Sequence, residues 1–335
     1  MSAQILDGKV VRDKIAEELK AEISRPRAKS RGSKCKLVII QIGDLAESNT
    51  YITQKVKFGE KIGATVEHIK LPEDINQKEI ISKLYSLNSS PSVHGVIVQL
   101  PLPNHLDKNQ IIDAIDPKKD VDGQTATNIK LLFEGSSVRH PRALPAGRQE
   151  SEDQILDQVE NDKKRFRGFV PATTKGIITL LDYYKIPIWG QHVVIVGRSS
   201  LVGKPTALAF LNRDATVTIC HSKTKNLANI TKGAHILIVA AGKSKLITKD
   251  HVTKGQIVID VGINIANTRV RPLKRSDPHI GKPESEPAGR KLTGDVDFEE
   301  VSKIVAAISP VPGGCGPMTV ASLYQNLLDA YNRQK

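Results

Sequence analysis

The sequence predicts an α/β protein of two domains, each with helices on both faces of a parallel sheet, in three layers. Runs of β-branched and aliphatic residues at 37–42, 95–100 and 193–196 are typical of buried parallel strands. Between such runs the apolar residues recur at helical spacing, as over 8–23, so strands and helices alternate along the chain. A length of 335 residues also favours two domains over one.

The first half of the chain predicts a β-α-β-α-β domain preceded by the helix over 8–23. Its expected elements are a strand over 37–42, helix over 51–62, strand over 63–69, helix over 76–87, strand over 95–100 and helix from about Lys108. Ser48, Asn49 and Thr50 are typical helix-capping residues, so we expect the helix to begin at Tyr51. Ligands of parallel sheets bind beyond the carboxyl ends of the strands, which predicts a cleft beside Gln99.

The second half of the chain predicts a Rossmann-like domain that begins with the strand over 193–196. Gly197 ends this strand, Gly203 follows six positions later, and the next residues are helical in pattern. This order is typical of a phosphate-binding loop, although Ser199 stands where the second glycine of the usual motif would be. A second strand over 216–220 follows at the spacing that a dinucleotide-binding unit requires. An ordinary strand–helix turn would leave the same glycines, and that alternative stays open.

The residues after the second strand favour NADP over NAD. An NAD site needs a carboxylate there for the ribose hydroxyls, whereas an NADP site needs cationic or hydroxyl groups for the 2′-phosphate. His221, Ser222 and Thr224 follow the strand without an acidic residue, and Arg198 stands in the glycine loop. Ordinary loop residues would give the same pattern, so this too is a hypothesis.

Composition and cysteine usage limit the class of protein. Hydrophobic residues make up 39% of the chain and charged residues 25%, as in ordinary globular enzymes. No apolar run is long enough to span a membrane, and the N-terminus shows no signal-peptide pattern. Cys35, Cys220 and Cys315 are widely scattered, which argues against a disulfide framework and a metal site. We therefore expect a cytoplasmic protein without a metal or a membrane partner.

The net charge of +13 is concentrated in two polar stretches. Residues 20–36 hold seven basic residues and one acidic, and residues 267–291 hold seven basic and three acidic. These stretches lack the aromatic residues of a single-strand-binding surface, so nucleic-acid binding is an alternative that the charge distribution disfavours. A basic surface also suits anionic small molecules such as NADP or a substrate with a glutamate tail.

Several polar residues are expected near the first cleft. Tyr51 and Lys55 are four residues apart and share one helix face, and Asp122 lies in a turn over 120–123. Taken singly, each has an ordinary structural explanation: the first two as an amphipathic surface pair and Asp122 as a turn former.

Seven motifs in one order make the chain recognisable. They are Tyr51-x-x-x-Lys55, Val-Gln-Leu-Pro-Leu-Pro at 98–103, Lys-Asp-Val-Asp-Gly at 119–123, Gly-Arg-Ser at 197–199, Asp-Val-Gly-Ile-Asn at 260–264, Gly-Asp-Val-Asp at 294–297 and Pro-Val-Pro-Gly-Gly-Cys-Gly-Pro-Met-Thr at 310–319. With them the chain resembles, over nearly its whole length, the bacterial type of the bifunctional methylenetetrahydrofolate dehydrogenase/methenyltetrahydrofolate cyclohydrolase family.

This resemblance implies a domain organisation and an activity. Residues 1–135, completed by 310–335, would form a folate-binding catalytic domain, and 168–309 a Rossmann-like NADP-binding domain, with the folate cleft between them. The enzyme would oxidise 5,10-methylenetetrahydrofolate with NADP, and then hydrolyse the methenyl product to 10-formyltetrahydrofolate for purine synthesis. Its substrates would be tetrahydrofolate derivatives, including polyglutamylated ones, and it would be a homodimer.

The resemblance also implies the site residues. Lys55 would be catalytic and oriented by Gln99, Tyr51 would stack on the folate ring, and Asp122 would bind the pterin edge. The other substrate-binding residues would be Ser48, Leu100, Pro101, Pro312, Gly313 and Gly314. The cofactor-binding residues would be Thr173, Gly197, Arg198, Ser199, Val202, Gly203, His221, Ser222, Thr224, Ala241, Gly242 and Ile263.

The chain departs from the family pattern at a few positions. Ala172 and Thr174 stand where the family has cysteine and proline, which predicts a looser turn near the cofactor. Residues 136–167 and part of 267–291 look inserted, and the first insert predicts a capped amphipathic helix starting at Ser151. We expect both inserts to be surface elaborations. A member of the family that retains only one of the two activities stays an open alternative.

Overall fold

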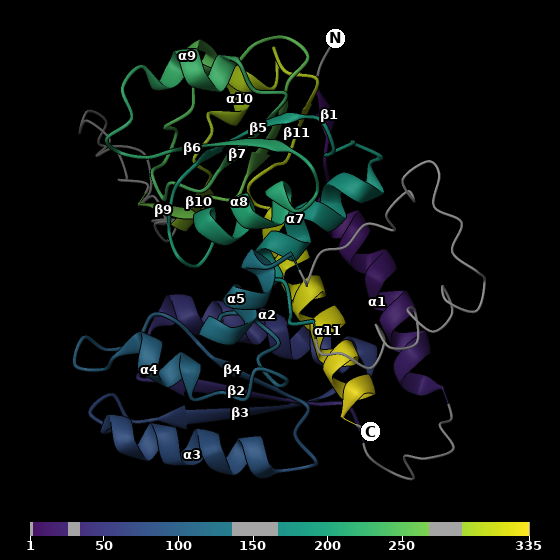
Figure 1. The fold of residues 1–335 in the computed structure, drawn as a ribbon, viewed down its shortest axis with the longest axis vertical. Coiled ribbons are helices and arrows are strands. Elements are labelled where there is room, and N and C mark those ends of the chain that lie inside the picture. The colour runs from purple at the N-terminus through teal and green to yellow at the C-terminus, as the bar shows by residue number, and fades with distance from the viewer. Residues whose placement is uncertain (1–2, 26–33, 136–166, 268–289, 335) are drawn as a thin grey trace, which may run out of the picture.

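Two parallel sheets organise the molecule, one in each of its two lobes (Figure 1). The structure is a computed structural model that describes residues 3–25, 34–135, 167–267 and 290–334. The predicted insert helix at Ser151 and most of the second insert therefore lie outside the described residues. In the part that is described, no helix is both long and apolar enough to span a membrane.

The first lobe is a three-layer β-α-β-α-β unit, as the alternating pattern predicts. Its elements are β2 (Lys36–Ile42), α2 (Ala46–Ile62), β3 (Thr65–Leu71), α3 (Gln77–Ser89), β4 (Gly95–Val98), α4 (Lys108–Asp113) and α5 (Ala126–Phe133), and the sheet order is β3-β2-β4. Leu37 and Ile39 of β2 pack in one core cluster with α2, whereas Val38 and Ile40 pack in another with α3 and α4. This alternation buries both faces of the sheet.

The second lobe is built on a six-stranded sheet of order β1-β11-β8-β7-β5-β6, parallel throughout. Its strands are β1 (Gln4–Ile5), β5 (His192–Val196), β6 (Thr216–Cys220), β7 (Ile236–Val239), β8 (Ile257–Asp260) and β11 (Ala307–Ile308). Its helices are α8 (Gly203–Leu211), α9 (Leu227–Lys232), η1 (Lys249–His251) and α10 (Phe298–Val301), and β9 (Asn264–Asn267) pairs with β10 (Arg290–Thr293). β5 and its neighbours are buried on both faces, so this lobe also has three layers.

The N-terminal strand β1 pairs with β11 of the second sheet, although the predicted division assigns residues 1–135 to the first domain. A strand of two residues leaves no periodic pattern in the sequence, and only its long-range pairing reveals it.

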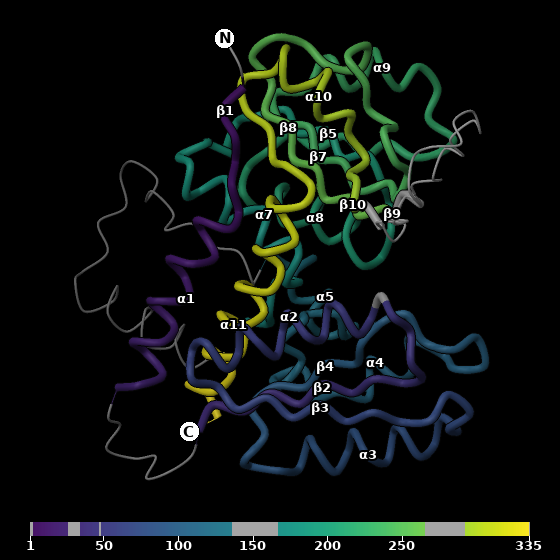
Figure 2. The backbone as a smooth tube through the Cα atoms, turned by 180° about the vertical axis from the view of Figure 1, so that it is seen from behind, coloured from purple at the N-terminus to yellow at the C-terminus, as the bar shows by residue number. Residues whose placement is uncertain are grey.

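Three helices connect the two lobes: α1 (Gly8–Ser24), α7 (Ala172–Tyr183) and α11 (Cys315–Arg333). Seen from behind, α11 descends from the upper lobe beside α1 to the first sheet (Figure 2). It packs against α7, α1 and α2, and one apolar core cluster runs through all four helices. The C-terminal helix thus returns to the first lobe, as expected, and begins three residues before the predicted Met318.

The predicted start of α2 is wrong. The helix begins at Ala46, with Leu45 as its N-cap, five residues before Tyr51. Asn49 does not cap it, because its side chain accepts a hydrogen bond from Gln41 Nε2 and donates one to Asp44 Oδ1, both at 2.7 Å. Ser48 is buried within the helix.

Candidate active site

Lys55 and Gln99 meet at the carboxyl end of the first sheet. The backbone N–H of Gln99 donates to Ile40 O at 2.8 Å, which fixes this residue directly after β4. Lys55, on α2, donates from Nζ to Gln99 Oε1 at 2.9 Å. Gln99 Nε2 donates in turn to Leu100 O at 2.8 Å, so the amide is held with its oxygen toward the lysine. The peptide bond from Leu100 to Pro101 is cis.

The surroundings of Lys55 lower its pKa below the ordinary lysine value. Burial lowers the pKa of Lys55, and the charge of Asp122 opposes this shift. Burial likewise raises the pKa of Asp122, with Lys55 opposing and Asp120 adding to that shift. Lys55 can therefore give up its proton at a lower pH than an exposed lysine, which suits a proton acceptor.

Tyr324 of α11 is a residue of this site that sequence reasoning missed. Its hydroxyl donates to the backbone oxygen of Lys55 at 2.7 Å, and its ring is buried against Phe58. The only signal in the sequence is that Tyr324 falls on the apolar face of the C-terminal helix. A contact between residues so far apart in the sequence comes from the fold.

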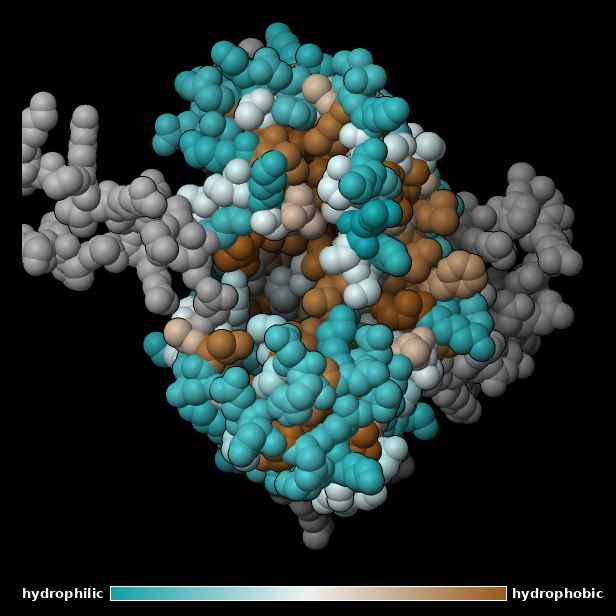
Figure 3. All heavy atoms as spheres, turned by 90° about the vertical axis from the view of Figure 1, so that its left-hand side faces the viewer, coloured by the Kyte–Doolittle hydropathy of each residue, from teal (hydrophilic) through white to brown (hydrophobic). Residues whose placement is uncertain are grey.

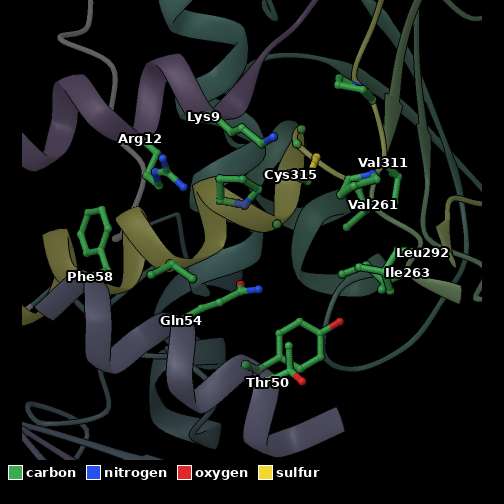
Figure 4. Close-up of a pocket in the computed structure, with 18 of the residues that line it drawn as sticks. Lys9, Arg12, Thr50, Gln54, Phe58, Val261, Ile263, Leu292, Val311 and Cys315 are labelled. Carbon is green, nitrogen blue, oxygen red and sulfur yellow. The ribbon is translucent and has the colours of Figure 1, made fainter. Parts of the chain in front are cut away.

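A pocket of about 710 Å³ opens between the two lobes, beside this site. Apolar residues gather around a hollow between the lobes in Figure 3. In the close-up of the pocket, α1 contributes Lys9 and Arg12, and residues of α2 lie along the lower side (Figure 4). Facing them are Val261, Ile263, Leu292 and Val311.

The pocket brings together only some of the predicted substrate residues. Its lining includes Tyr51 and the turn Pro312–Gly314, but not the other predicted ones: Ser48, Lys55, Gln99, Leu100, Pro101 and Asp122. Tyr51 lies one helical turn before Lys55 on α2, so the Lys55 site adjoins the pocket.

The pocket lining includes four cationic residues that the sequence did not lead us to predict: Lys9, Arg12, Lys57 and Lys61. They form an i,i+3 pair on α1 and an i,i+4 pair on α2, a spacing that could have indicated a shared basic face. Arg12 and Lys61 each pair with Asp13 at 2.9 Å, so Lys9 and Lys57 supply most of the positive charge beside the apolar walls.

The predicted Pro312–Gly314 turn is tied to the start of α1. Gly8 N donates to Gly313 O at 2.9 Å, and a Cβ on Gly8 would lie 2.0 Å from Gly314 O. Only glycine allows the backbones to come this close. The contact fixes the turn at the edge of the pocket.

The predicted phosphate loop forms between β5 and α8, and its glycines are required by close packing. A Cβ on Gly197, where φ is 130°, would lie 2.2 Å from Ala240 O, and one on Gly203 would lie 2.2 Å from Gly197 O. Ser199 Oγ accepts from the N–H groups of Val202 at 3.2 Å and Gly203 at 3.4 Å. The loop therefore makes the tight strand-to-helix turn of a phosphate-binding loop, and Ser199 accepts from two of its N–H groups.

Residues predicted to contact the 2′-phosphate gather beside this loop. Val196 and Cys220 are paired at the ends of β5 and β6, so the residues that follow each strand share one edge of the sheet. Arg198 and Ser222 are exposed there. His221 N donates to Thr224 Oγ1 at 2.8 Å, which holds the second loop in a turn. The edge offers a cation and a hydroxyl, as a 2′-phosphate requires.

The other predicted cofactor residues lie on different elements. Thr173 is in the first turn of α7 and accepts from Thr319 Oγ1 at 3.4 Å, and Ile263 lines the pocket. Ala241 and Gly242 are exposed after β7, but their N–H groups point inward to Asp295. These two N–H groups are therefore engaged within the protein.

Thr174 stands where the family pattern has proline, but it does not loosen the turn before α7. Thr174 is buried in the first helical turn, where its hydroxyl lies 3.0 Å from that of Thr206 on α8. Lys175 N donates to Pro171 O at 2.8 Å, so the helix begins with a regular turn. Among the described residues, no group of three or more His, Cys, Asp or Glu side chains could hold a metal.

Two family models match this chain. The catalytic domain of tetrahydrofolate dehydrogenase/cyclohydrolase matches residues 6–122, and the NAD(P)-binding domain of the same family matches residues 171–335. The chain belongs to this family. The resemblance inferred from the seven motifs is thus confirmed, as is the α/β class with two domains.

Relatives extend the match over the full length. A protein of Nitrosospira multiformis named bifunctional protein FolD is 40% identical over 330 residues, which cover 98% of this chain and 96% of the relative. The crystal structure of the bifunctional FolD enzyme from Campylobacter jejuni is 39% identical, with a TM-score of 0.81, and covers 99% of this chain and 100% of its own. The Trypanosoma brucei FolD structure, complexed with NADP cofactor and inhibitor, is 30% identical with the same TM-score and covers 99% and 98% of the two chains.

Proposed function

We propose that this enzyme oxidises 5,10-methylenetetrahydrofolate to 5,10-methenyltetrahydrofolate with NADP, and then hydrolyses that product to 10-formyltetrahydrofolate. Membership of the dehydrogenase/cyclohydrolase family over nearly the whole chain supports both activities. The observation that carries the proposal is the Lys55–Gln99 hydrogen bond beside the pocket, because it supplies the proton acceptor that hydrolysis requires.

In the first step the protein positions the reactants. Tyr51 lines the pocket on the same face of α2 as Lys55, so a folate ring stacked on it would bring its one-carbon bridge near the lysine. Asp122 would accept hydrogen bonds from the planar pterin edge. The lone pair of the substrate's adjacent nitrogen drives hydride loss, so alignment is the main contribution of these residues. NADP, when bound, accepts the hydride.

In the second step Lys55 acts as the proton acceptor. Water adds to the carbon of the methenyl cation, and one water proton passes to the Lys55 amine. The bond from that carbon to N5 then breaks as the hydroxyl proton moves to N5, which leaves a formyl group on N10. A neutral amine can accept this proton, and the lowered pKa of Lys55 makes the neutral form accessible. Gln99 keeps the amine directed at the cleft.

The residues of the second lobe fit NADP. The tight Gly197 loop lies between β5 and α8, where a pyrophosphate would bind, and Arg198 and Ser222 lie exposed at the sheet edge where the 2′-phosphate would bind. No acidic residue occurs between positions 221 and 224 to repel that phosphate. We therefore propose a strong preference for NADP over NAD.

The cationic pocket fits the acidic tail of folate. With the ring on Tyr51, the p-aminobenzoyl group would follow the apolar wall, and the glutamate carboxylates would reach Lys9 and Lys57. Arg12 and Lys61 also line the pocket, but both pair with Asp13. Positive charge at this distance from the ring favours polyglutamylated substrates, which carry more carboxylates.

The assembly and location of the enzyme belong to the same proposal. β6 forms an edge of the second sheet, and its Ile219 is 41% exposed, which supports a homodimer joined through the NADP-binding lobes. Cys35, Cys220 and Cys315 are free, which supports a cytoplasmic location. Sedimentation equilibrium tests the dimer, and a monomer at micromolar concentration would contradict it.

The decisive experiment mixes the purified enzyme with 5,10-methylenetetrahydrofolate and NADP, and follows absorbance at the wavelengths of NADPH and of the methenyl product. Both activities predict that NADPH rises while the methenyl intermediate forms and then decays to the formyl product. A methenyl product that accumulates without decay would indicate that only the dehydrogenase is present. Supplied 5,10-methenyltetrahydrofolate tests hydrolysis independently.

A further inference from the structure

Two buried carboxylates, Asp260 and Asp295, lie next to each other beneath the loops that face the pocket and the cofactor edge. Asp260 ends β8 and is 3% exposed, and Asp295 precedes α10 and is fully buried. Buried carboxylates occur where they accept several hydrogen bonds. The partners of these two residues connect elements of both proposed sites.

Asp295 holds the loop after β7. Its carboxylate accepts hydrogen bonds from the backbone N–H groups of Ala241 at 2.6 Å, Gly242 at 2.8 Å and Lys243 at 2.8 Å. It also accepts from Asn264 Nδ2, at the start of β9, at 2.9 Å. One side chain thus fixes three successive residues after β7 and the segment after β8.

Asp260 connects this arrangement to the folate side. Its carboxylate accepts from the N–H groups of Gly262 at 3.0 Å, Asp295 at 3.0 Å and Val296 at 2.9 Å. Its own N–H donates to Ser309 Oγ at 2.8 Å. Ser309 immediately precedes the 310–314 turn that lines the pocket.

Glycines let the backbone close around both carboxylates. A Cβ on Gly262 would lie 2.1 Å from the carboxyl carbon of Asp295, and one on Gly294 would lie 1.9 Å from Asp260 Oδ2. Burial also raises the pKa of Asp260 to about 7. Both side chains are buried, so the hydrogen bonds of the pair are shielded from water and hold the loops in place.

The sheet order shows why these positions matter. The strand order β11-β8-β7-β5 puts the loops after β7 and β8 between the Gly197 loop and the turn after β11. A dinucleotide with its phosphates at Gly197 and its reactive ring at the pocket must cross both loops. Val261, Gly262 and Ile263, after β8, already line that pocket.

We propose that Asp295 is a positioning residue for hydride transfer. Its hydrogen bonds fix the 241–243 loop and Asn264 in the positions that the cofactor passes, while Asp260 fixes the position of Asp295 relative to the 310–314 turn. This inference rests on the proposed dehydrogenase activity. Hydrolysis of the methenyl substrate uses Lys55 and needs no cofactor, so Asp295 should affect one activity and not the other.

The test is Asp295→Asn, assayed for both activities. In either orientation the amide replaces one carboxylate oxygen by an NH₂ group that faces N–H donors, so two of the four hydrogen bonds are lost. We expect the Kd and KM for NADP to rise about tenfold, the loss that weakened charged hydrogen bonds produce. Hydrolysis of supplied 5,10-methenyltetrahydrofolate should stay within about threefold of the unsubstituted enzyme.

Asp297→Asn is the matched control. This carboxylate lies two residues further along, is half-buried, and pairs with Lys245 at 3.3 Å. It does not contact the 241–243 loop, so both activities and the KM for NADP should remain unchanged.

Asn264→Ala keeps the proposal testable if Asp295→Asn does not fold. It removes one donor to Asp295 and leaves the carboxylate with its three backbone partners. We expect a smaller rise in the KM for NADP, about threefold, with hydrolysis unaffected. If both activities fall together in this variant, or if NADP binding is unchanged in both variants, the proposal is overturned. Calorimetric titration measures NADP binding in each variant and so tests the positioning role without a dehydrogenase assay. A lack of dehydrogenase activity in the unsubstituted enzyme would refute the proposed function instead.

Discussion

Lys55 is held at both ends of the residue. Gln99 accepts from its amine at 2.9 Å, and Tyr324 donates to its backbone oxygen at 2.7 Å. Burial lowers its pKa, so the amine can be both well placed and unprotonated. These properties suit a group that takes a proton from water.

Replacing Lys55 should separate the two activities. Lys55→Met keeps length and apolar bulk but removes the amine, so cyclohydrolase activity should fall by at least about 10²-fold, the usual contribution of a positioned base. Dehydrogenase activity should fall less, and methenyltetrahydrofolate should accumulate during turnover, which an absorbance trace would record. Lys55→Arg should not restore hydrolysis, because guanidinium stays protonated.

The control for the two Lys55 variants is Lys83→Met, at an exposed lysine of α3 on the far side of the first sheet. It should leave both activities unchanged. If saturating folate restored hydrolysis in Lys55→Met, the lysine would be a substrate anchor and not a base.

The lowered pKa of Lys55 also predicts how hydrolysis depends on pH. A base works unprotonated, and the unprotonated fraction rises through the pKa and levels off above it, so the midpoint of the rise in kcat should lie below pH 10.5, the ordinary lysine value. The charge of Asp122 raises the pKa of Lys55. Asp122→Asn should therefore move the rising limb to lower pH, as measured at saturating folate. A limb that stays in place or moves to higher pH would contradict the assignment.

At the scale of elements, backbone and side chains have different roles in the loop between β5 and α8. Gly197 and Gly203 allow close packing, and Ser199 accepts from the first N–H groups of the helix. Arg198 is exposed beside the loop, and its position suits contact with a ligand.

Arg198→Ala should therefore weaken NADP binding far more than NAD binding. A charge-assisted contact to the 2′-phosphate contributes about 1.5–3 kcal/mol, or about tenfold to a hundredfold in affinity. Parallel titrations of the two cofactors measure the ratio, with Lys204→Ala as a control at a neighbouring exposed cation. Equal losses for NADP and NAD would show that Arg198 supports the loop itself.

At the scale of the whole molecule, α11 joins the lobes through polar as well as apolar contacts. Asn326, buried in the middle of the helix, donates to Val121 O at 3.0 Å and Val170 O at 3.1 Å, and accepts from Lys175 Nζ at 2.9 Å. It thereby ties the chain just before Asp122 to the segment that leads into α7.

Asn326→Leu should lower the free energy of unfolding by about 1–3 kcal/mol, because it removes a hydrogen bond to each of two backbone carbonyl groups and leaves the Lys175 amine with its longer ion pair to Asp329, at 3.9 Å. Urea unfolding followed by circular dichroism measures this change. Asn109→Leu makes the same substitution at an exposed position of α4 and should change stability by less than about 0.5 kcal/mol. Equal effects of the two variants would mean that the buried amide is not important for joining the lobes.

The sequence alone determined the fold class, most elements and the residue types of the chemistry. Continuous apolar runs such as 193–196 specify buried parallel strands, and the seven motifs place Lys55, Gln99 and Asp122 in one family of sites. These signals are local or lie in fixed order along the chain, so a linear reading captures them.

Only the tertiary structure decided which distant residues meet. Three contacts join segments far apart in sequence: the pairing of β1 with β11, the hydrogen bond from Tyr324 to Lys55, and the hydrogen bonds from the 241–243 loop to Asp295. The start of α2 was missed because Asn49 bonds to Gln41 across the fold, where local capping preference has no influence. Such contacts depend on how sheets and helices pack, and no local pattern encodes that packing.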